Sequence, residues 1–592
     1  MAAPRAGAVV NHPFGSRPLT YAAGTILPNH LGLPVLDQAV RDFYDAWKAK
    51  YVSQQCGAGR YLVEANTQLG NLTVSEGQGY GMVITAMMAG HDPTAQTVFD
   101  GMYAFFRDHP TAAHANLMSW YQNDSCDDAQ GNNSASDGDL DIAFALLLAD
   151  EQWGSAGAVD YASEALAVIA DIKDGDTDTT TRYVTLGDWV TPADSTYYPS
   201  TRTSDFMMDH YRSFEAATSD SDWAALLDQT YTIIAALQAG YSPATGLLPD
   251  FVLDPLTTPV PAGPGFLEGS ADGAYSYNAA RDPWRIATDY IVSGDERAKT
   301  ALDTINTWLR SSTSESPAAI QAGYQLNGTP LPGTGYISMA FIAPFGVGAM
   351  VDVSNQAWLN DTWDLVDGTS IEDEGYFENT LKMLSMLVMS GNWWAPALAT
   401  CGDAESCTII DACDGAGRCV GSTEPAALCT LPLTAGRSTL VIKEKGTKDS
   451  LVWKWSKGPE VLAAAFGDPT TSDDYTLCLY DETGGSTTVL LTPAAPAGST
   501  AWVSKGDKGF LYKKKDLLPD GIRLIKLAAG TVGKAKITFK AKGEALGIST
   551  LGFDPSATIT AQLRNSSGAC FGAVYQAPFL KNEANQFRDR SE

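Results

Sequence analysis

The chain has 592 residues, of which 44% are hydrophobic and 18% charged, a globular composition that disfavours disorder, collagen and a membrane bundle. Its 39 Lys and Arg residues against 69 Asp and Glu give a net charge of −30. Such a polyanion gains nothing from counterion release, so we expect neither nucleic acid nor an anionic membrane as a partner. No stretch approaches the roughly 20 apolar residues of a spanning helix.

The charge is unevenly distributed along the chain. Residues 1–400 carry 17 basic and 48 acidic residues, a net −31, whereas residues 401–592 carry 22 and 21, a net +1. This contrast, in a chain much longer than a typical domain, predicts at least two domains.

Residues 34–390 show helical apolar spacing in twelve successive segments, which predicts six helical hairpins. A closed double ring of helices would bring the connecting loops together at one end, where a long cleft for a polymer could form. The twelve segments are 34–50, 78–90, 94–107, 138–151, 159–172, 204–217, 221–238, 280–292, 295–309, 336–350, 355–365 and 376–389.

Five of the nine cysteines lie in residues 401–429, a stretch rich in Asp, Gly, Ala and Ser. This pattern predicts a small disulfide-stapled segment and therefore a secreted protein. A zinc site is the alternative, although CxxC pairs and a nearby His are missing. The start of the chain has no hydrophobic signal core, so we expect either a cytosolic protein or one from which a signal peptide has been removed. Cys56 with Cys126, and Cys478 with Cys570, are candidates for further bridges, and the odd count leaves at least one cysteine unpaired.

After the Cys-rich stretch the pattern changes to alternation rich in Val, Ile and Thr, with Gly- and Pro-containing turns. We expect a β-sandwich, and hence a helical domain over 1–398, a Cys-rich linker over 399–432 and a β-domain over 433–592. The predicted strands are 438–442, 450–455, 476–480, 487–491, 521–527, 534–540 and 558–563. A solvated strand face is the simpler explanation for the lysines of this domain, and a polysaccharide- or wall-binding role is the alternative; they are Lys513, Lys514, Lys515, Lys534, Lys536 and Lys540.

The first chemical motif is Ser75-Glu-Gly-Gln-Gly-Tyr-Gly-Met82, directly before an apolar helix. Three glycines at alternate positions allow another segment to approach the backbone closely, which leaves Glu76 open to a ligand. The alternative is structural: Ser75 caps the helix and Glu76 complements the helix dipole.

The second motif places Asp137, Asp139 and Asp141 at alternate positions before a buried helix. One acid would suffice as a helix cap, and three would repel one another without sugar hydroxyls, water or an ion. A calcium site is an alternative, but the loop lacks the usual Glu and Gly spacing. We expect no bound metal or cofactor.

At these two motifs the sequence closely resembles glycoside hydrolase family 8. The Asp-Gly-Asp segment with the following helix and Trp153 fits the family signature, and the segment around Glu76 fits its acid-bearing loop. The resemblance covers roughly residues 12–396, and its further motifs begin at Leu117, Leu186, Arg202, Tyr277, Tyr324 and Ser390.

The resemblance implies an all-α (α/α)6 barrel that hydrolyses β-1,4-linked glycans with inversion. Inversion needs one carboxylic acid to protonate the leaving oxygen and a second carboxylate to activate a water on the opposite face of the sugar. Glu76 matches the general acid, and Asp137 matches the acid that holds the distorted central sugar. Burial and the nearby Asp137 would both raise the pKa of Glu76, as a general acid requires.

The general base departs from the pattern of many family members. They carry an aspartate where this chain has Asn278, and an asparagine is not a useful base. A subgroup that includes chitosanases active on β-glucans shares this asparagine and takes its base from a preceding loop. Glu268 matches that loop carboxylate, Asp272 is the reserve candidate, and the structural alternative is that Glu268 is one more surface acid.

Aromatic rings are expected to form the sugar subsites, because sugar rings have apolar faces that stack on indole and phenol. Each of these aromatic residues is equally compatible with a place in the core. Arg281 is expected to orient the base or water, and Asp205 to support the cleft. The aromatic candidates are Trp120, Trp189, Tyr275 and Tyr376, the last of which resembles a tyrosine near the catalytic water.

These observations together predict a secreted, monomeric, inverting endo-β-1,4-glycanase of the chitosanase and β-glucanase subgroup. The net −31 of residues 1–400 would attract polycationic chitosan, and cellulose-type or mixed-linkage β-glucan are also expected substrates. The alternatives are an endo-xylanase of the same family and a carbohydrate-binding or adhesion protein whose barrel has lost catalysis.

Overall fold

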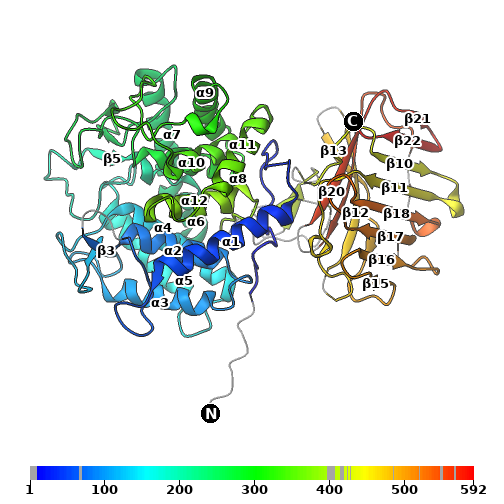
Figure 1. Ribbon diagram of the computed structural model, residues 1–592, viewed down its shortest axis with the longest axis horizontal. Helices are drawn as coiled ribbons and strands as arrows, with labels where there is room; N and C mark the ends of the chain where they lie inside the picture. Colours follow the sequence, from blue (N-terminus) through cyan, green and yellow to red (C-terminus); the bar gives the residue numbers. More distant parts are fainter. Residues whose placement is uncertain are drawn as a thin grey trace, which may run out of the picture. The chain divides into compact units, whose positions relative to one another are not determined.

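The computed structural model divides the chain into two compact units, one formed mainly by residues 39–398 and the other mainly by residues 399–592. Each unit is described by itself (Figure 1). The structure describes residues 10–592 except 66–69, 397–406, 408, 414–418, 423–424, 427–428, 472, 484–485, 519, 547, 549–550 and 566–568.

The described part of the first unit contains twelve α-helices, one for each predicted segment, so the predicted fold class is confirmed. They are α1 (Leu33–Tyr51), α2 (Ser75–Met87), α3 (Ala95–Asp108), α4 (Ser136–Trp153), α5 (Tyr161–Asp171), α6 (Met208–Thr218), α7 (Asp222–Tyr241), α8 (Asp282–Ser293), α9 (Glu296–Ser312), α10 (Met339–Ala349), α11 (Gln356–Gly368) and α12 (Tyr376–Met389). None of the helices in the described ranges is long and apolar enough to cross a bilayer.

The even-numbered helices form a closed inner ring. Helix α2 packs on α4, α4 on α6, and so on through α8, α10 and α12, which returns to α2. The odd-numbered helices from α3 to α11 each pack outside the inner helix before them. Every residue of α10 is buried, whereas outer helices such as α9 keep a polar face, and this division of apolar pattern defines an (α/α)6 barrel.

The loops that lead into the inner helices carry the residues singled out by the sequence. Glu76 and Asp137 lie in the first turns of α2 and α4, Arg281 directly precedes α8, and Tyr376 begins α12. Short strands brace these loops: β1 (Val52–Ser53) with β2 (Leu62–Val63), β3 (Asn71–Val74) with β4 (Tyr121–Asn123), and β5 (Ser200–Arg202), β6 (Phe251–Leu253) and β7 (Val260–Pro261) in one sheet.

Glycines allow α2 and α4 to cross closely. A Cβ on Gly138 would lie 2.5 Å from Ser75 Oγ and 2.6 Å from the Ser75 carbonyl carbon. A Cβ on Gly79 would lie 2.7 Å from Asp141 Cβ and 2.9 Å from the Gly138 oxygen. Residue 74, not Ser75, is the N-cap of α2 and makes no side-chain cap bond, so Ser75 does not cap this helix. The glycines therefore serve helix packing at the point where Glu76 and Asp137 meet.

The second unit is an antiparallel β-sandwich. One sheet has the order β15-β16-β17-β18-β11-β10-β22-β21, and the other has β13-β12-β19-β20 with β14 beside β12. Trp453, Trp455, Phe539 and Tyr575 are among the buried residues of the core between them. The strands are β10 (Ser438–Lys443), β11 (Ser450–Ser456), β12 (Tyr475–Thr483), β13 (Ser486–Leu491), β14 (Ala494–Ala495), β15 (Trp502–Ser504), β16 (Gly509–Lys513), β17 (Ile522–Ala528), β18 (Lys536–Lys542), β19 (Thr558–Asn565), β20 (Cys570–Gln576), β21 (Lys581–Glu583) and β22 (Gln586–Arg590).

The seven predicted strands are all present, but the sequence interpretation missed others. Strand β16 is short and begins at Gly509, and Gly572 interrupts the large apolar residues of β20. Strands β21 and β22 are short and polar, and their place in the sheet comes from the pairing of β22 with β10 and of β21 with β22. A further hairpin of β8 (Ile409–Cys413) and β9 (Cys419–Ser422) lies in the Cys-rich stretch.

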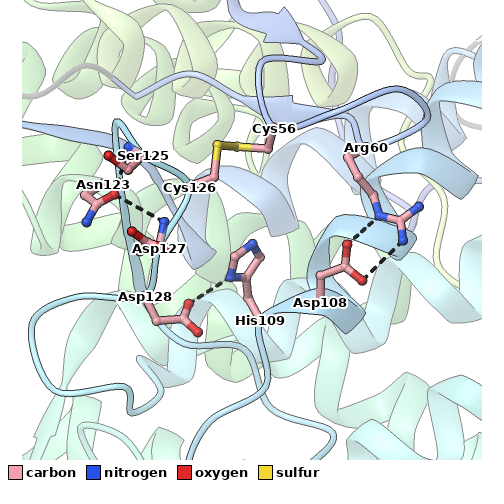
Figure 2. The surroundings of a disulfide bond; sticks show 9 residues. All are labelled: Cys56, Arg60, Asp108, His109, Asn123, Ser125, Cys126, Asp127 and Asp128. Carbon is pink, nitrogen blue, oxygen red and sulfur yellow. Dashed lines mark hydrogen bonds and ion pairs between the residues drawn. A yellow bond between two sulfur atoms is a disulfide. The ribbon is translucent and has the colours of Figure 1, made fainter.

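Three disulfides join described residues, and one predicted pairing is wrong. Cys56 and Cys126 are bridged as expected, close to the ion pair of Arg60 with Asp108 (Figure 2). Cys478 bonds Cys407 and Cys570 bonds Cys429, instead of each other. The spacing of cysteines could not show that β12 and β20 lie on opposite sides of β19, which keeps Cys478 and Cys570 apart. Cys401 and the side chains of Cys413 and Cys419 lie outside the described residues.

We predict that Gly138→Ala destabilises the protein by about 1–3 kcal/mol, because the new methyl group overlaps the backbone of α2. Urea unfolding measures the change. Gly240→Ala is the matched control, since its Cβ meets nothing within 4 Å near the end of α7, and it should leave stability equal or slightly higher. Equal stability of both variants would show that the close crossing of α2 and α4 is not required.

Candidate active site

Glu76 is a carboxyl group enclosed by the barrel at the start of α2. Its side chain is 17% exposed, its Oε2 accepts a hydrogen bond of 2.8 Å from Arg281 Nη1, and its Oε1 lies 3.4 Å from the donating hydroxyl of Tyr376. Burial raises the pKa of Glu76 to about 7, against the opposing effect of Arg281 and with the help of Asp137. A carboxyl group with this pKa is protonated in a large fraction of molecules near neutral pH.

Asp137 lies in the first turn of α4 with both of its oxygens engaged. Its Oδ2 accepts 2.8 Å from Arg281 Nη1 and lies 3.6 Å from Arg202 Nη1, and its Oδ1 accepts from the backbone N–H of Gly138. Burial would raise the pKa of Asp137, but Arg202 and Arg281 together lower it. The site therefore holds one carboxyl group that keeps its proton and one that remains ionised.

The other two acids of the second motif face different partners, because helical geometry separates alternate residues. Asp141 accepts two hydrogen bonds from Arg285 and one from His210, and these groups lower its pKa despite burial. Asp139 accepts only from the N–H of Met118, and burial raises its pKa well above the usual range. Neither side chain shares the partners of Asp137, and no group of three or more possible metal ligands is present in the described ranges.

A continuous chain of hydrogen bonds connects Glu268 with Glu76. Glu268 Oε2 accepts 2.8 Å from Asn278 Nδ2, and Asn278 Oδ1 accepts 2.8 Å from Arg281 Nη2. Arg281 then donates through its other terminal nitrogen to Glu76 and Asp137. The guanidinium group thus connects three carboxylates, two directly and Glu268 through Asn278, although at least 61 residues separate them in the sequence.

Asp272, the reserve base, has a different position. Its Oδ2 accepts from the backbone N–H groups of Leu267 and Glu268 at 2.8 and 3.2 Å, and its Oδ1 accepts from Gly269 at 2.8 Å. The residue is 3% exposed, whereas Glu268 is exposed. Asp272 therefore holds the loop that presents Glu268, and its own oxygens are occupied.

Two of the predicted substrate contacts lie deeper than expected. Tyr275 has no exposed surface and stacks on Phe345 with ring centroids 5.5 Å apart, a core environment that leaves no face for a sugar. Asp205 is also fully buried, where burial raises its pKa to about 6 against the opposing charge of Arg202. Asp205 can therefore act on a ligand only indirectly, through its charge beside Arg202 and Arg281.

Two of the predicted aromatic residues are partly exposed. Trp120 directly precedes β4, and its carbonyl oxygen accepts a hydrogen bond from the N–H of Ser75, so it neighbours the start of α2. Trp189 contacts Tyr197, which contacts Phe266 in the loop of Glu268.

Three further functional candidates were missed from the sequence. The exposed Tyr277 and Tyr336 share a hydroxyl hydrogen bond of 2.7 Å, and Tyr277 lies beside Phe377, over which Arg281 packs. Strand alternation could not have separated Tyr277 from Tyr275, because residues two apart on a strand share a face, and only the tertiary structure shows that one is buried and the other exposed. Arg202 belongs to a motif the sequence interpretation noticed, but its role follows only from its 3.6 Å distance to Asp137.

The described residues match known proteins over the barrel. Residues 32–391 match the family model of glycosyl hydrolases family 8. The chain is 47% identical over 387 residues to a beta-glucanase of Niallia circulans, which covers 65% of this chain and 92% of the relative. It is 39% identical over 384 residues to an endoglucanase of Bacillus sp. (strain KSM-330), covering 63% and 80%.

A solved structure agrees with this relationship. The apo structure of a beta-1,3-1,4-glucanase from Paenibacillus sp. X4 is 46% identical and superposes with a TM-score of 0.62, covering 65% of this chain and 99% of that one. A cold-adapted family 8 xylanase has the same fold at 17% identity, with a TM-score of 0.53. With a match over more than half of its length and relatives well above 30% identity, the chain belongs to family 8 of the glycosyl hydrolases.

Proposed function

We propose that this protein is an inverting endo-β-1,4-glycanase in which Glu76 is the general acid and Glu268 the general base. The observation that carries this proposal is a pair of carboxyl groups, Glu76 half-buried and Glu268 exposed, that are connected through Asn278 and Arg281. In an inverting reaction the acid protonates the glycosidic oxygen while the base takes a proton from the attacking water.

The remaining groups support this division of roles. Asp137, kept ionised by two guanidinium groups, is suited to stabilise the positive charge that develops on the central sugar. The hydroxyl of Tyr376 reaches Glu76, and Arg281 fixes the orientation of the acid. Trp120, Trp189, Tyr277 and Tyr336 are proposed as stacking surfaces for the sugar rings.

The relatives favour β-glucan as the substrate. The relatives at 39–47% identity are named beta-glucanase, endoglucanase and beta-1,3-1,4-glucanase, whereas the family 8 xylanase is only 17% identical. Mixed-linkage β-glucan is therefore the first choice. Chitosan is the second candidate because the net −31 of residues 1–400 attracts a polycation, and xylan comes last.

Secretion and a monomeric state are also proposed. Three disulfides among the described residues are typical of a protein that matures in an oxidising compartment. The site residues all come from one chain, so a second subunit is not needed to complete the site.

We predict that Glu268→Gln lowers reducing-sugar release from mixed-linkage β-glucan by about 10²–10⁴-fold, because the attacking water loses its base. Glu268→Ala should regain turnover with azide, which attacks without a base and gives a glycosyl azide of inverted configuration. Asp272→Asn is the matched control. It keeps the base but loosens its loop, so its smaller loss should not respond to azide. Full activity of Glu268→Gln would contradict the assignment.

We predict that kcat/KM on polymeric glucan falls about tenfold per pH unit above pH 7. The pKa of Glu76 is raised to about 7, and the carboxylate formed above it cannot protonate the leaving oxygen. The dinitrophenolate of a 2,4-dinitrophenyl cello-oligosaccharide leaves without needing a proton. The pH profile of kcat/KM on this substrate should therefore lack the alkaline limb. The same limb on both substrates would assign it to another group.

We predict that Asn278→Asp lowers kcat more than Asn278→Ala does and moves the acid limb of the pH profile to higher pH. The substitution removes the donor to Glu268 and places a like charge beside it, so the pair of carboxylates holds a proton more strongly. Asn278→Ala removes the bond without adding charge, so its acid limb should move much less. Equal profiles for both variants would show that Asn278 does not position the base.

A further inference from the structure

Nearly all charged side chains on one face of the β-sandwich are cationic. In the strands of the eight-stranded sheet, alternate residues such as Trp453, Ile525 and Phe539 enter the core and are fully buried. The residues between them point to the opposite face, as the alternating burial of β10, β11, β17 and β18 shows. Eight lysines and two arginines occupy these outward positions, and we call them the cationic face: Lys443, Lys454, Lys513, Lys526, Lys536, Lys540, Lys542, Lys581, Arg588 and Arg590.

The strand register brings these cations into rows across the sheet. Lys526 pairs with Thr538, Thr538 with Lys454, Lys454 with Thr439, and Thr439 with Arg590. Neighbouring strands lie about 4.8 Å apart and alternate residues about 6.8 Å apart along a strand, so the charges form a two-dimensional array.

Acidic residues do not neutralise this array. The eight strands contain two acids, of which Asp589 is 4% exposed and directed to the core, and Glu583 pairs with Lys581 at 3.1 Å. The other nine members of the cationic face make no side-chain hydrogen bond or ion pair with the part of the chain that the structure describes. The opposite sheet carries Asp481 and Glu482 on β12 and Arg564 on β19, and most other acids of the domain lie in turns, so the acids are kept apart from the strand positions of the cationic face.

This separation has an energetic cost that a ligand would offset. Like charges on adjacent strands repel one another, whereas acidic residues placed between them on the same face would remove this repulsion. Each contact between a bound polyanion and a cation of the face contributes favourable binding free energy and releases counterions. This contribution becomes smaller as the salt concentration rises.

The side-chain types narrow the class of ligand. All aromatic residues of these strands are buried, so the face offers no stacking platform for neutral sugars or for nucleic-acid bases; they are Trp453, Trp455, Trp502, Phe510, Tyr512, Phe539 and Phe587. Lysine dominates over arginine, which suits flexible contacts with single carboxylates better than bidentate contacts with phosphates. The lack of an outward aromatic anchor also disfavours insertion into a bilayer interface.

We propose that the cationic face binds an anionic polysaccharide whose carboxylate groups contact lysines on several strands. The net −31 of residues 1–400 repels the same polymer, so it would occupy the β-domain and not compete with a neutral glucan for the barrel. The face would thereby hold the enzyme on a matrix where an acidic polysaccharide accompanies the glucan. This inference does not depend on the assignment of the acid and base.

The test is binding of the full chain to polygalacturonate in 50 mM NaCl, measured by affinity electrophoresis, beside neutral mixed-linkage β-glucan. The variant K454Q/K526Q/K540Q removes three exposed cations of the face, and K445Q/K448Q/K457Q removes three exposed lysines from turns of the same domain. We expect the face variant to lose at least tenfold in affinity for polygalacturonate and to keep wild-type hydrolysis of β-glucan. The turn variant should lose much less, and 500 mM NaCl should abolish binding.

Any one of the following outcomes would overturn the proposal. Wild type and both variants could bind polygalacturonate with equal affinity, or wild type could fail to bind it. Vesicles with anionic phosphatidylserine, or duplex DNA, could bind instead of polygalacturonate and lose binding in the face variant. Wild type could form oligomers in 50 mM NaCl that K454Q/K526Q/K540Q dissolves, which would make a second copy the partner. Circular dichroism of each variant confirms that it is folded before binding is compared.

Discussion

The buried guanidinium group of Arg281 is the interaction on which the site depends. A buried cation without partners would cost several kcal/mol, and here it is compensated by Glu76, Asp137 and the amide of Asn278. The same contacts join three parts of the chain: the start of α2, the start of α4 and the segment before α8. Removing Glu76 or Asp137 would leave part of the charge of Arg281 uncompensated, so these side chains form one electrostatic unit.

The barrel supplies the position and the polarity of that unit. The functional side chains lie where chains enter the inner helices, and the N-terminal end of a helix carries a partial positive charge that favours carboxylates. The glycines of α2 and α4 remove the Cβ atoms that would hold the two helices apart. Packing therefore brings Glu76 near Asp137, while burial keeps one proton on Glu76 and two arginines keep it off Asp137.

The two units of the chain differ in how their charges are distributed. The barrel region is strongly acidic, whereas the β-sandwich collects its cations on one sheet and leaves acids to the other parts of the domain. The net charge of +1 of residues 401–592 does not indicate the cationic face, because it also counts the acids elsewhere in the domain. Only the strand register shows that lysines distant in sequence stand next to one another.

The twelve helices and the β-domain could be predicted from the sequence alone, because periodicity is a property of neighbouring residues. Local motifs likewise indicated Glu76 and Glu268 as candidate catalytic residues. Other features depended on contacts between distant segments and needed the tertiary structure. The pairing of Cys478 with Cys407 depends on sheet order, and the burial of Tyr275 in place of Tyr277 depends on which side of its segment faces the core. Likewise, Asp272 and Glu268 are both acids of one loop, and only the three backbone N–H groups bound by Asp272 distinguish the residue that holds the loop from the one that faces outward.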